Sequence, residues 1–189
     1  QAKRIIIIAS PNVQDNFKLQ LFDYRKLKKV NGLWTLNSCT GNKFIKEVNP
    51  MNIKNVPKEK IIRQVNGIIS KKYLFLGYLE FANYIARLLN KFSHVSDERK
   101  REKYKIDKLK KEFNNRLLVI DEVHNIRDSE EKNKKVVLNL TKIVKYSDNL
   151  KLLLLSATPM FNSYKEIIWL LNLMNLNDKR STIDYEEVF

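Results

Sequence analysis

The chain has 189 residues, of which 43% are hydrophobic, and its formal net charge is +15 at pH 7. This length suits one domain, or one lobe of a larger protein. The apolar runs fall far short of the ~18 residues of a membrane-spanning helix, and the single cysteine, Cys39, excludes an internal disulfide framework. The composition therefore predicts an intracellular protein with no membrane association.

The positive charge is concentrated in the first part of the chain. Residues 1–116 hold 26 Lys and Arg against 10 Asp and Glu, a balance of +16, whereas residues 117–189 hold 10 against 11, a balance of −1. A basic excess of this size favours a polyanionic partner, because lysines neutralise phosphates and release counterions. The alternative is a set of solvated lysines in a chain biased toward Asn, Lys and Ile, and charge alone does not separate the two.

The first elements combine a strand with a helical region. The β-branched run Ile5–Ile8 predicts a buried strand, and the turn-like residues 9–12 follow it. Apolar residues at helical spacing predict an amphipathic helix over Val13–Lys28. Leu33–Leu36 and Phe44–Val48 are interpreted as two short extended pieces around a turn.

The middle of the chain alternates between helix and strand. After an irregular connector over residues 49–57, the pattern predicts a helix over Lys58–Ser70, a strand over Tyr73–Leu76 and a helix over Leu79–Phe92. The densely charged segment Ser96–Glu112 is typical of a solvated helix.

The last third contains two unbroken apolar runs, Leu117–Ile120 and Leu152–Leu155. Runs without alternation are typical of strands buried on both faces of a parallel sheet. Between them, Asp128 and Glu131 suit a helix start, and a second capping box at Ser163–Glu166 opens a final helix. The alternation of strand and helix predicts an α/β fold with a mainly parallel sheet and right-handed crossovers.

Chemically capable residues follow both apolar runs. Asp121, Glu122 and His124 come directly after the first, and Ser156 and Thr158 after the second. Ligands of open parallel sheets bind beyond the carboxyl ends of the strands, so both groups would face one edge. There Asp121 could hold Mg²⁺ directly or through water, and Glu122 could activate a water molecule. Taken singly, an acidic pair, a surface imidazole or a Ser-Ala-Thr-Pro turn is ordinary; their joint placement favours an active site.

With these residues in place, the sequence resembles the superfamily 2 helicases and translocases. Asp121–His124 looks like their DExH box (motif II), and Ser156–Ala157–Thr158 looks like motif III. Ile5–Val13 is similar to motif Ia, and Leu74–Tyr78, more loosely, to motif Ib. The segments around these motifs look most like helicases of large double-stranded DNA viruses, including poxvirus-type early transcription ATPases.

The resemblance implies a RecA-like three-layer sandwich spanning residues 1–189 and a protein that uses ATP and Mg²⁺. Asp121 would position magnesium and Glu122 would activate the water. His124, Ser156, Ala157 and Thr158 would couple the nucleotide state to the grip on nucleic acid. The nucleic-acid backbone, DNA or RNA, would lie near four residues of the basic part of the chain: Pro11, Asn12, Gly77 and Tyr78. A viral origin would place the protein in a virion or a cytoplasmic viral factory, with transcription machinery as a partner.

The sequence also departs from the family. None of the four glycines belongs to a G-x-x-x-x-G-K-[ST] loop, so no residues here cradle the β- and γ-phosphates. We expect that loop upstream, the second helicase lobe downstream, and this chain to be an internal fragment. The missing phosphate-loop strand would pair with Leu152–Leu155, so its absence would leave an apolar, aggregation-prone edge.

Two further functions fit the same residues. One is a non-catalytic nucleic-acid-binding module derived from a helicase lobe, which would bind in a salt-sensitive manner without hydrolysis. The other is an interaction platform whose basic surface meets an acidic protein.

Overall fold

The computed structural model describes residues 3–126, 131–160, 165–184 and 186. The chain divides into two compact units. The first, called the sheet unit below, comprises Gln1–Ala9 and Phe75–Phe189, and the second, called the inserted unit, comprises Ser10–Leu74. No helix in the described part of the chain is both long and apolar enough to cross a membrane.

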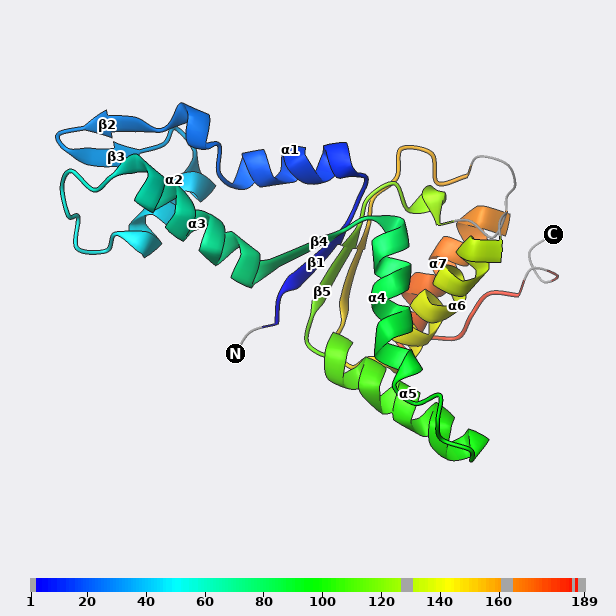
Figure 1. Ribbon diagram of the computed structural model, residues 1–189. Coiled ribbons are helices and arrows are strands. Elements are labelled where there is room, and N and C mark those ends of the chain that lie inside the picture. Colours follow the sequence, from blue (N-terminus) through cyan, green and yellow to red (C-terminus); the bar gives the residue numbers. More distant parts are fainter. Residues whose placement is uncertain (1–2, 127–130, 161–164, 185, 187–189) are drawn as a thin grey trace. The chain divides into compact units, whose positions relative to one another are not determined.

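A four-stranded sheet forms the centre of the fold (Figure 1). Its strands are β1 (Ile5–Ile8), β4 (Tyr73–Leu76), β5 (Leu117–Ile120) and β6 (Lys151–Leu154), in the order β4-β1-β5-β6. β5 runs parallel to both β1 and β6. The Ala9 N–H donates a hydrogen bond of 3.0 Å to the Leu76 carbonyl, so the carboxyl ends of β1 and β4 are adjacent. The predicted α/β class with a mainly parallel sheet is confirmed, and it is that of a RecA-like lobe.

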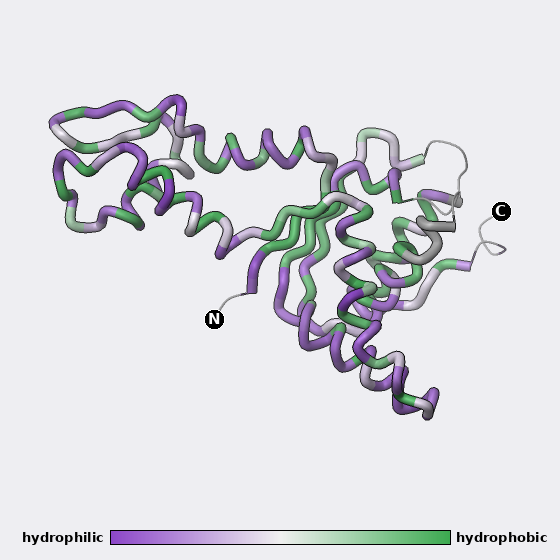
Figure 2. The backbone as a smooth tube through the Cα atoms, in the orientation of Figure 1, coloured by the Kyte–Doolittle hydropathy of each residue, from purple (hydrophilic) through white to green (hydrophobic). Residues whose placement is uncertain are grey.

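The strands are the most apolar part of the chain, as Figure 2 shows. Parallel register aligns Ile6 with Leu118 and Ile8 with Ile120, and these four side chains are fully buried. Four helices complete the sheet unit: α4 (Tyr78–Asn90), α5 (Glu98–Phe113), α6 (Glu131–Tyr146) and α7 (Lys165–Asn177). They pack on one another in the pairs α4–α5, α4–α6, α5–α6 and α6–α7. The helical side chains at the centre of this core are Phe81, Ile85, Leu109, Phe113, Leu140 and Ile143.

β6 is an edge strand of the sheet in the described part of the chain. Its Leu153 lies in register with Val119 of β5. Val119 is 6% exposed and Leu153 is 46% exposed, so burial of this row falls sharply at β6. An exposed apolar edge strand is a template for further strand pairing, and it is the edge at which the sequence predicts the phosphate-loop strand.

The inserted unit is built from short elements. It contains α1 (Pro11–Leu21), a 3-10 turn (Tyr24–Lys26), β2 (Lys28–Val30), β3 (Leu33–Thr35), α2 (Cys39–Val48) and α3 (Lys58–Lys72). β2 and β3 form an antiparallel hairpin through Asn31 and Gly32, both of which have positive φ. Asn and Gly tolerate this left-handed conformation best, which explains the tight turn at this point.

Two of the predicted elements in this unit were wrong. The helix expected over Val13–Lys28 begins earlier, at Pro11, and ends at Leu21. It ends because Asp23 caps a 3-10 turn, its side chain accepting from the Arg25 N–H, and Lys28 then enters the hairpin.

The second wrong element is Phe44–Val48, which was expected to be extended and is helical in α2. Ser38 caps this helix by accepting from the Gly41 N–H at 3.2 Å, as N-cap serines commonly do. Phe44 and Ile45 are buried on its inner face. Two neighbouring apolar residues can be buried in a helix or in a strand, so the Ser38 cap explains why this segment is helical. The two predicted capping residues Asp128 and Ser163 lie outside the described residues.

Truncating Phe113 tests the core of the sheet unit. Phe113 is fully buried near the C-terminal end of α5, so Phe113→Ala should lower the free energy of unfolding by about 3–5 kcal/mol. Tyr104→Ala on the same helix is the matched control, because that ring is half exposed and its loss should cost about 1 kcal/mol. Urea unfolding curves measure both, and equal losses would contradict this core assignment.

Candidate active site

The DExH box is fixed in place by backbone hydrogen bonds to both neighbouring strands. As β5 ends, the Asp121 N–H donates to the Ile8 carbonyl of β1 at 2.9 Å. The Leu155 N–H donates to the Ile120 carbonyl at 2.9 Å, and the Val123 N–H donates back to the Leu155 carbonyl at 3.0 Å. Parallel pairing therefore continues past the last strand residues and fixes this segment relative to β1 and to the end of β6.

Glu122 turns the chain at this point. Its φ of 45° and ψ of 53° place it in the left-handed region, and a 3-10 turn over Val123–Asn125 follows directly. A non-glycine residue in this region carries strain of about 1–3 kcal/mol. In a continuing strand, Asp121 and Glu122 would point to opposite faces. The turn instead brings the carboxyl groups of Asp121 and Glu122 and the imidazole of His124 within electrostatic range of one another.

His124 connects the two predicted motifs directly. Its Nδ1 lies 2.9 Å from Ser156 Oγ and 3.4 Å from Thr158 Oγ1. Ser156 Oγ also accepts from the Thr158 N–H at 3.2 Å, which closes the Ser-Ala-Thr turn. Residues more than 30 positions apart in the sequence thus form one polar cluster, in which Ala157 is the exposed centre of the turn.

The Glu122 carboxylate keeps unused hydrogen-bonding capacity. Its Oε2 lies 3.2 Å from His124 Nδ1, within ion-pair distance. This oxygen is nevertheless buried without a hydrogen bond from any described residue. A buried carboxylate oxygen in this state is costly unless a donor such as water reaches it.

Tyr78, the first residue of α4, is hydrogen-bonded to the DExH box. Its hydroxyl donates to the Asp121 carbonyl at 2.7 Å and accepts, at 3.5 Å, from Asn125 Nδ2. Burial raises the pKa of the Tyr78 hydroxyl above its usual range, and the charges of Asp121 and Glu122 raise it further. The hydroxyl therefore stays protonated and remains a donor at neutral pH.

Asp121 sits in an environment that opposes its ionisation. Partial burial raises the pKa of its carboxyl above the usual range, and the negative charge of Glu122 adds to this effect. A neighbouring carboxylate and desolvation both disfavour a second negative charge. A cation at this position would relieve both costs.

The donor set at this edge suits a magnesium ion held mainly by other ligands. The described residues contain no group of three or more His, Cys, Asp or Glu that could hold a metal. Mg²⁺ typically takes only one or two carboxylates and completes its shell with waters and substrate phosphates. Asp121 and Glu122, side by side at the carboxyl end of β5, fit that mode and do not form a closed protein cage.

The other predicted site residues have separate positions. Gly77 is the N-cap of α4, and its N–H is occupied by Glu80 Oε2 at 2.8 Å. Pro11 and Asn12 begin α1, so they belong to the inserted unit and not to the unit that carries the DExH box. The structure thus groups Tyr78 with Asp121, Glu122, His124, Ser156 and Thr158.

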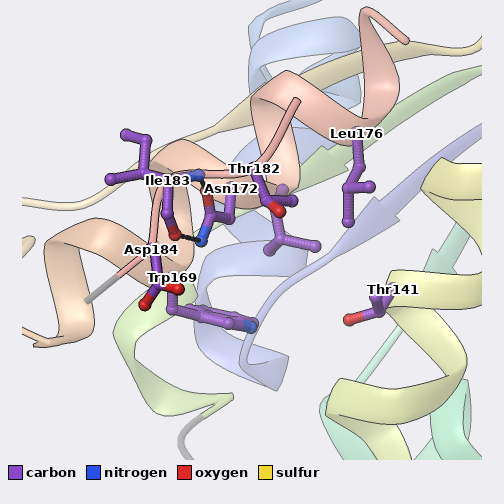
Figure 3. Close-up of a pocket in the computed structure, with 8 residues that line it drawn as sticks. Thr141, Trp169, Asn172, Leu176, Thr182, Ile183 and Asp184 are labelled. Atoms are coloured by element: carbon purple, nitrogen blue, oxygen red, sulfur yellow. Dashed lines mark hydrogen bonds between the residues drawn. The ribbon is translucent and has the colours of Figure 1, made fainter. Parts of the chain in front are cut away.

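Sequence reasoning missed two features of the sheet unit. The contact of the Tyr78 hydroxyl with the Asp121 backbone has no motif signal, because any tyrosine after a strand looks the same. The other is a cavity of about 580 Å³ between α6 and α7, which Figure 3 shows lined by Thr141, Trp169 and Asp184. Asn172 forms one wall by pairing with both backbone groups of Ile183. This cavity contains none of the predicted site residues.

A mainly parallel sheet with DExH and Ser-Ala-Thr sequences at its carboxyl edge defines a superfamily 2 RecA-like lobe. The family model of the SNF2-related domain matches residues 42–189, which is more than half of the chain. The chain therefore belongs to the SNF2-related domain family.

One curated relative adds to this assignment. A protein of Acanthamoeba polyphaga mimivirus, named an ATP-dependent RNA helicase, is 26% identical over 177 residues. The match covers 86% of this chain and 15% of the mimivirus protein. No solved structure gives a significant match.

Replacing Asp121 tests its electrostatic environment. Because the folded pKa is raised, ionisation of Asp121 opposes folding at neutral pH, and this penalty vanishes below the unfolded pKa of about 4. Asp121→Asn should therefore stabilise the fold at pH 7, and the gain should shrink as pH falls to 4. Thermal unfolding across this range measures it. The exposed Asp107→Asn on α5 is the control, and a pH-independent effect at Asp121 would contradict the assignment.

Proposed function

We propose that this chain is part of an ATP-dependent helicase or translocase, in which ATP hydrolysis drives movement on DNA or RNA. The observation that carries the proposal is the direct contact between the DExH box and the Ser-Ala-Thr turn, with His124 Nδ1 2.9 Å from Ser156 Oγ. The SNF2-related family match agrees with it. Together they support a site in which residues of the hydrolysis step also contact residues that respond to it.

In this proposal the two carboxylates have different roles. Asp121 would hold Mg²⁺, and the ion, when bound, would supply positive charge that neutralises the nucleotide phosphates.

 Asp121 would hold this ion through a water molecule. Glu122 orients and deprotonates the attacking water, a role supported by its side chain, which is 42% exposed at the carboxyl end of β5 and can contact water.

His124, Ser156, Ala157 and Thr158 transmit the outcome of hydrolysis. Ser156 follows β6, and the Val123 N–H is bonded to the Leu155 carbonyl next to it. A shift of the DExH box would therefore move the Ser-Ala-Thr turn through the backbone bond of Val123 to Leu155 and the side-chain contact of His124 with Ser156. We assign these four residues to the coupling between nucleotide state and grip on nucleic acid.

The site needs a phosphate-binding loop from elsewhere in the full-length protein. The 189 residues contain no G-x-x-x-x-G-K-[ST] sequence. The exposed edge of β6, with Leu153 46% exposed, suits the pairing of a further strand that carries this loop. A second helicase lobe would complete the ATP site on its other side.

The proposed track is a nucleic-acid backbone, bound near Pro11, Asn12, Gly77 and Tyr78. The excess of positive charge over residues 1–116 supports this partner. We further propose a viral role in transcription or replication, inside a virion or a cytoplasmic viral factory, with transcription machinery as a partner. The viral source of the mimivirus relative supports the viral part of this proposal.

Substitution of the carboxylates in the full-length protein tests the proposed hydrolysis. Asp121→Asn and Glu122→Gln should each lower nucleic-acid-stimulated ATP turnover by about 10²–10⁴-fold, since each removes a proposed catalytic group. Asp107→Asn on α5 is the control and should retain full turnover. Phosphate release measures the rate.

The same variants separate the proposal from a non-catalytic module. If salt-sensitive binding to nucleic acid persists and neither carboxylate substitution alters turnover or function, the lobe is a binding module and the proposed hydrolysis is wrong.

The 189-residue chain by itself provides a second test. Without a phosphate-binding loop, it should hydrolyse no ATP above background, and its open β6 edge should make it aggregate. Leu153→Lys should raise its solubility, because a charged side chain on an edge strand blocks strand pairing. Turnover by the isolated chain, or equal aggregation of both forms in light scattering, would contradict the corresponding part of the proposal.

A further inference from the structure

The inserted unit carries most of the positive charge of the chain. Its 65 residues, Ser10–Leu74, hold 13 Lys and Arg against 4 Asp and Glu, a balance of +9 out of the total of +15. Part of this charge gathers where the β2–β3 hairpin meets the loop over residues 49–57. We call this region the basic tip and define it by three lysines: Lys29, Lys54 and Lys58.

Trp34 organises the basic tip. The Nζ atoms of Lys29 and Lys58 lie 5.8 Å and 5.9 Å from the centre of its ring. The indole N–H donates to the Val56 carbonyl at 2.7 Å. These contacts hold lysines from the hairpin and from the start of α3 around one aromatic ring.

The loop is also fastened to the turn of the hairpin. The Asn55 N–H donates to the Gly32 carbonyl at 2.8 Å. The Cβ of Lys54 packs so closely on Gly32 that a Cβ added to the glycine would lie 3.2 Å from it. The basic tip is therefore a preformed surface made by two segments of the inserted unit.

The three lysines of the basic tip have no acidic partners among the described residues. None of them forms a salt bridge with any residue in the described ranges, whereas Asp23 pairs with Arg25 and Glu47 pairs with Lys72 in the same unit. Gathering unpaired cations on one surface costs free energy through mutual repulsion. An anionic partner would remove that cost.

Exposed apolar side chains lie on the same two segments. Val30 at the hairpin turn is 53% exposed, and Met51 and Ile53 in the loop are 82% and 61% exposed. A lysine cluster that is merely solvated does not explain three exposed apolar side chains among its own segments. A partner with both anionic and apolar surface explains both features.

We propose that the basic tip binds single-stranded nucleic acid as an accessory contact outside the ATP site. The lysines contact successive phosphates, and Val30, Met51 and Ile53 pack on the faces of unpaired bases. A duplex buries those base faces, so a single strand fits the apolar residues better. This proposal rests on the proposed function, because a helicase or translocase binds nucleic acid, and that choice of partner is made here over an acidic protein.

Charge removal in the full-length protein tests the phosphate contacts. The triple variant Lys29→Gln, Lys54→Gln, Lys58→Gln should weaken binding of a labelled single-stranded oligonucleotide, without ATP, by tenfold or more. The slope of log K against log salt should fall by about 2, at ~0.7 per lost phosphate contact. The control, Arg99→Gln, Lys103→Gln, Lys111→Gln on α5, removes the same charge and should change affinity less than about twofold. Circular dichroism checks that both variants fold.

A second variant tests the apolar contacts. Met51→Ser, Ile53→Ser should weaken single-strand binding by about fivefold, leave the salt slope unchanged and leave duplex binding unaffected. Wild-type affinity of the lysine variant, or an equal loss in the α5 control, would overturn the proposal. An equal loss of single-strand and duplex binding in the Met51 and Ile53 variant would overturn the preference for single strands.

Two further outcomes separate this proposal from its alternatives. If the lysine variant binds nucleic acid normally but loses a protein partner whose capture survives nuclease treatment, the basic tip binds an acidic protein and the proposal is wrong. Glu122→Gln should lower turnover by about 10²–10⁴-fold and leave ATP-free binding through the basic tip intact. Loss of binding only in the basic-tip variants, with turnover unaffected by Glu122→Gln, would overturn the proposed hydrolysis while supporting the basic tip.

Discussion

The parallel register of β1, β5 and β6 is the constraint on which the candidate site depends. Each strand is four residues long, and the register pairs Ile120 with both Ile8 and Leu154, so the three strands end at the same level. The pairing continues beyond the strands, through the bonds of Asp121 to Ile8 and of Val123 to Leu155. A slip of one residue would reverse the faces of every side chain in the register, and it would separate His124 from Ser156.

The buried apolar rows hold this register in place. Ile6 and Leu118 align in one row and Ile8 and Ile120 in another, all fully buried, so a slipped strand would expose several of them at about 25 cal/mol per Å² of apolar surface. That stability also supports the strained left-handed turn at Glu122, a conformation that persists only where its surroundings fix it. Core packing and site geometry are thus linked through the ends of the same strands.

The strands could be predicted from the sequence, and so could the proximity of His124 to Ser156 and Thr158, because unbroken apolar runs followed by polar residues carry a strong signal. Tyr73–Leu76 and Leu117–Ile120 were predicted with their observed bounds. The prediction of an extended Phe44–Val48 was wrong because a short apolar run is compatible with a strand or a helix. The residue that caps the helix, Ser38, lies six residues before this run. The turn at Glu122 and the contact of Tyr78 with Asp121 depend on tertiary placement, which no local pattern encodes.

The position of the inserted unit in the chain follows from the same sheet. It leaves after β1 and returns through β4, and the hydrogen bond from the Ala9 N–H to the Leu76 carbonyl joins the ends of these two strands. A segment whose two ends are fixed side by side can vary in length and composition at small entropic cost, since closure entropy grows only slowly with loop length. The sheet unit can therefore keep the register of the DExH box while the inserted unit carries a balance of +9 and its exposed apolar residues. Because β1 and β4 lie on the side of β5 opposite to β6, a change in this insertion leaves the pairing of β5 with β6, and with it the contact between His124 and Ser156, undisturbed.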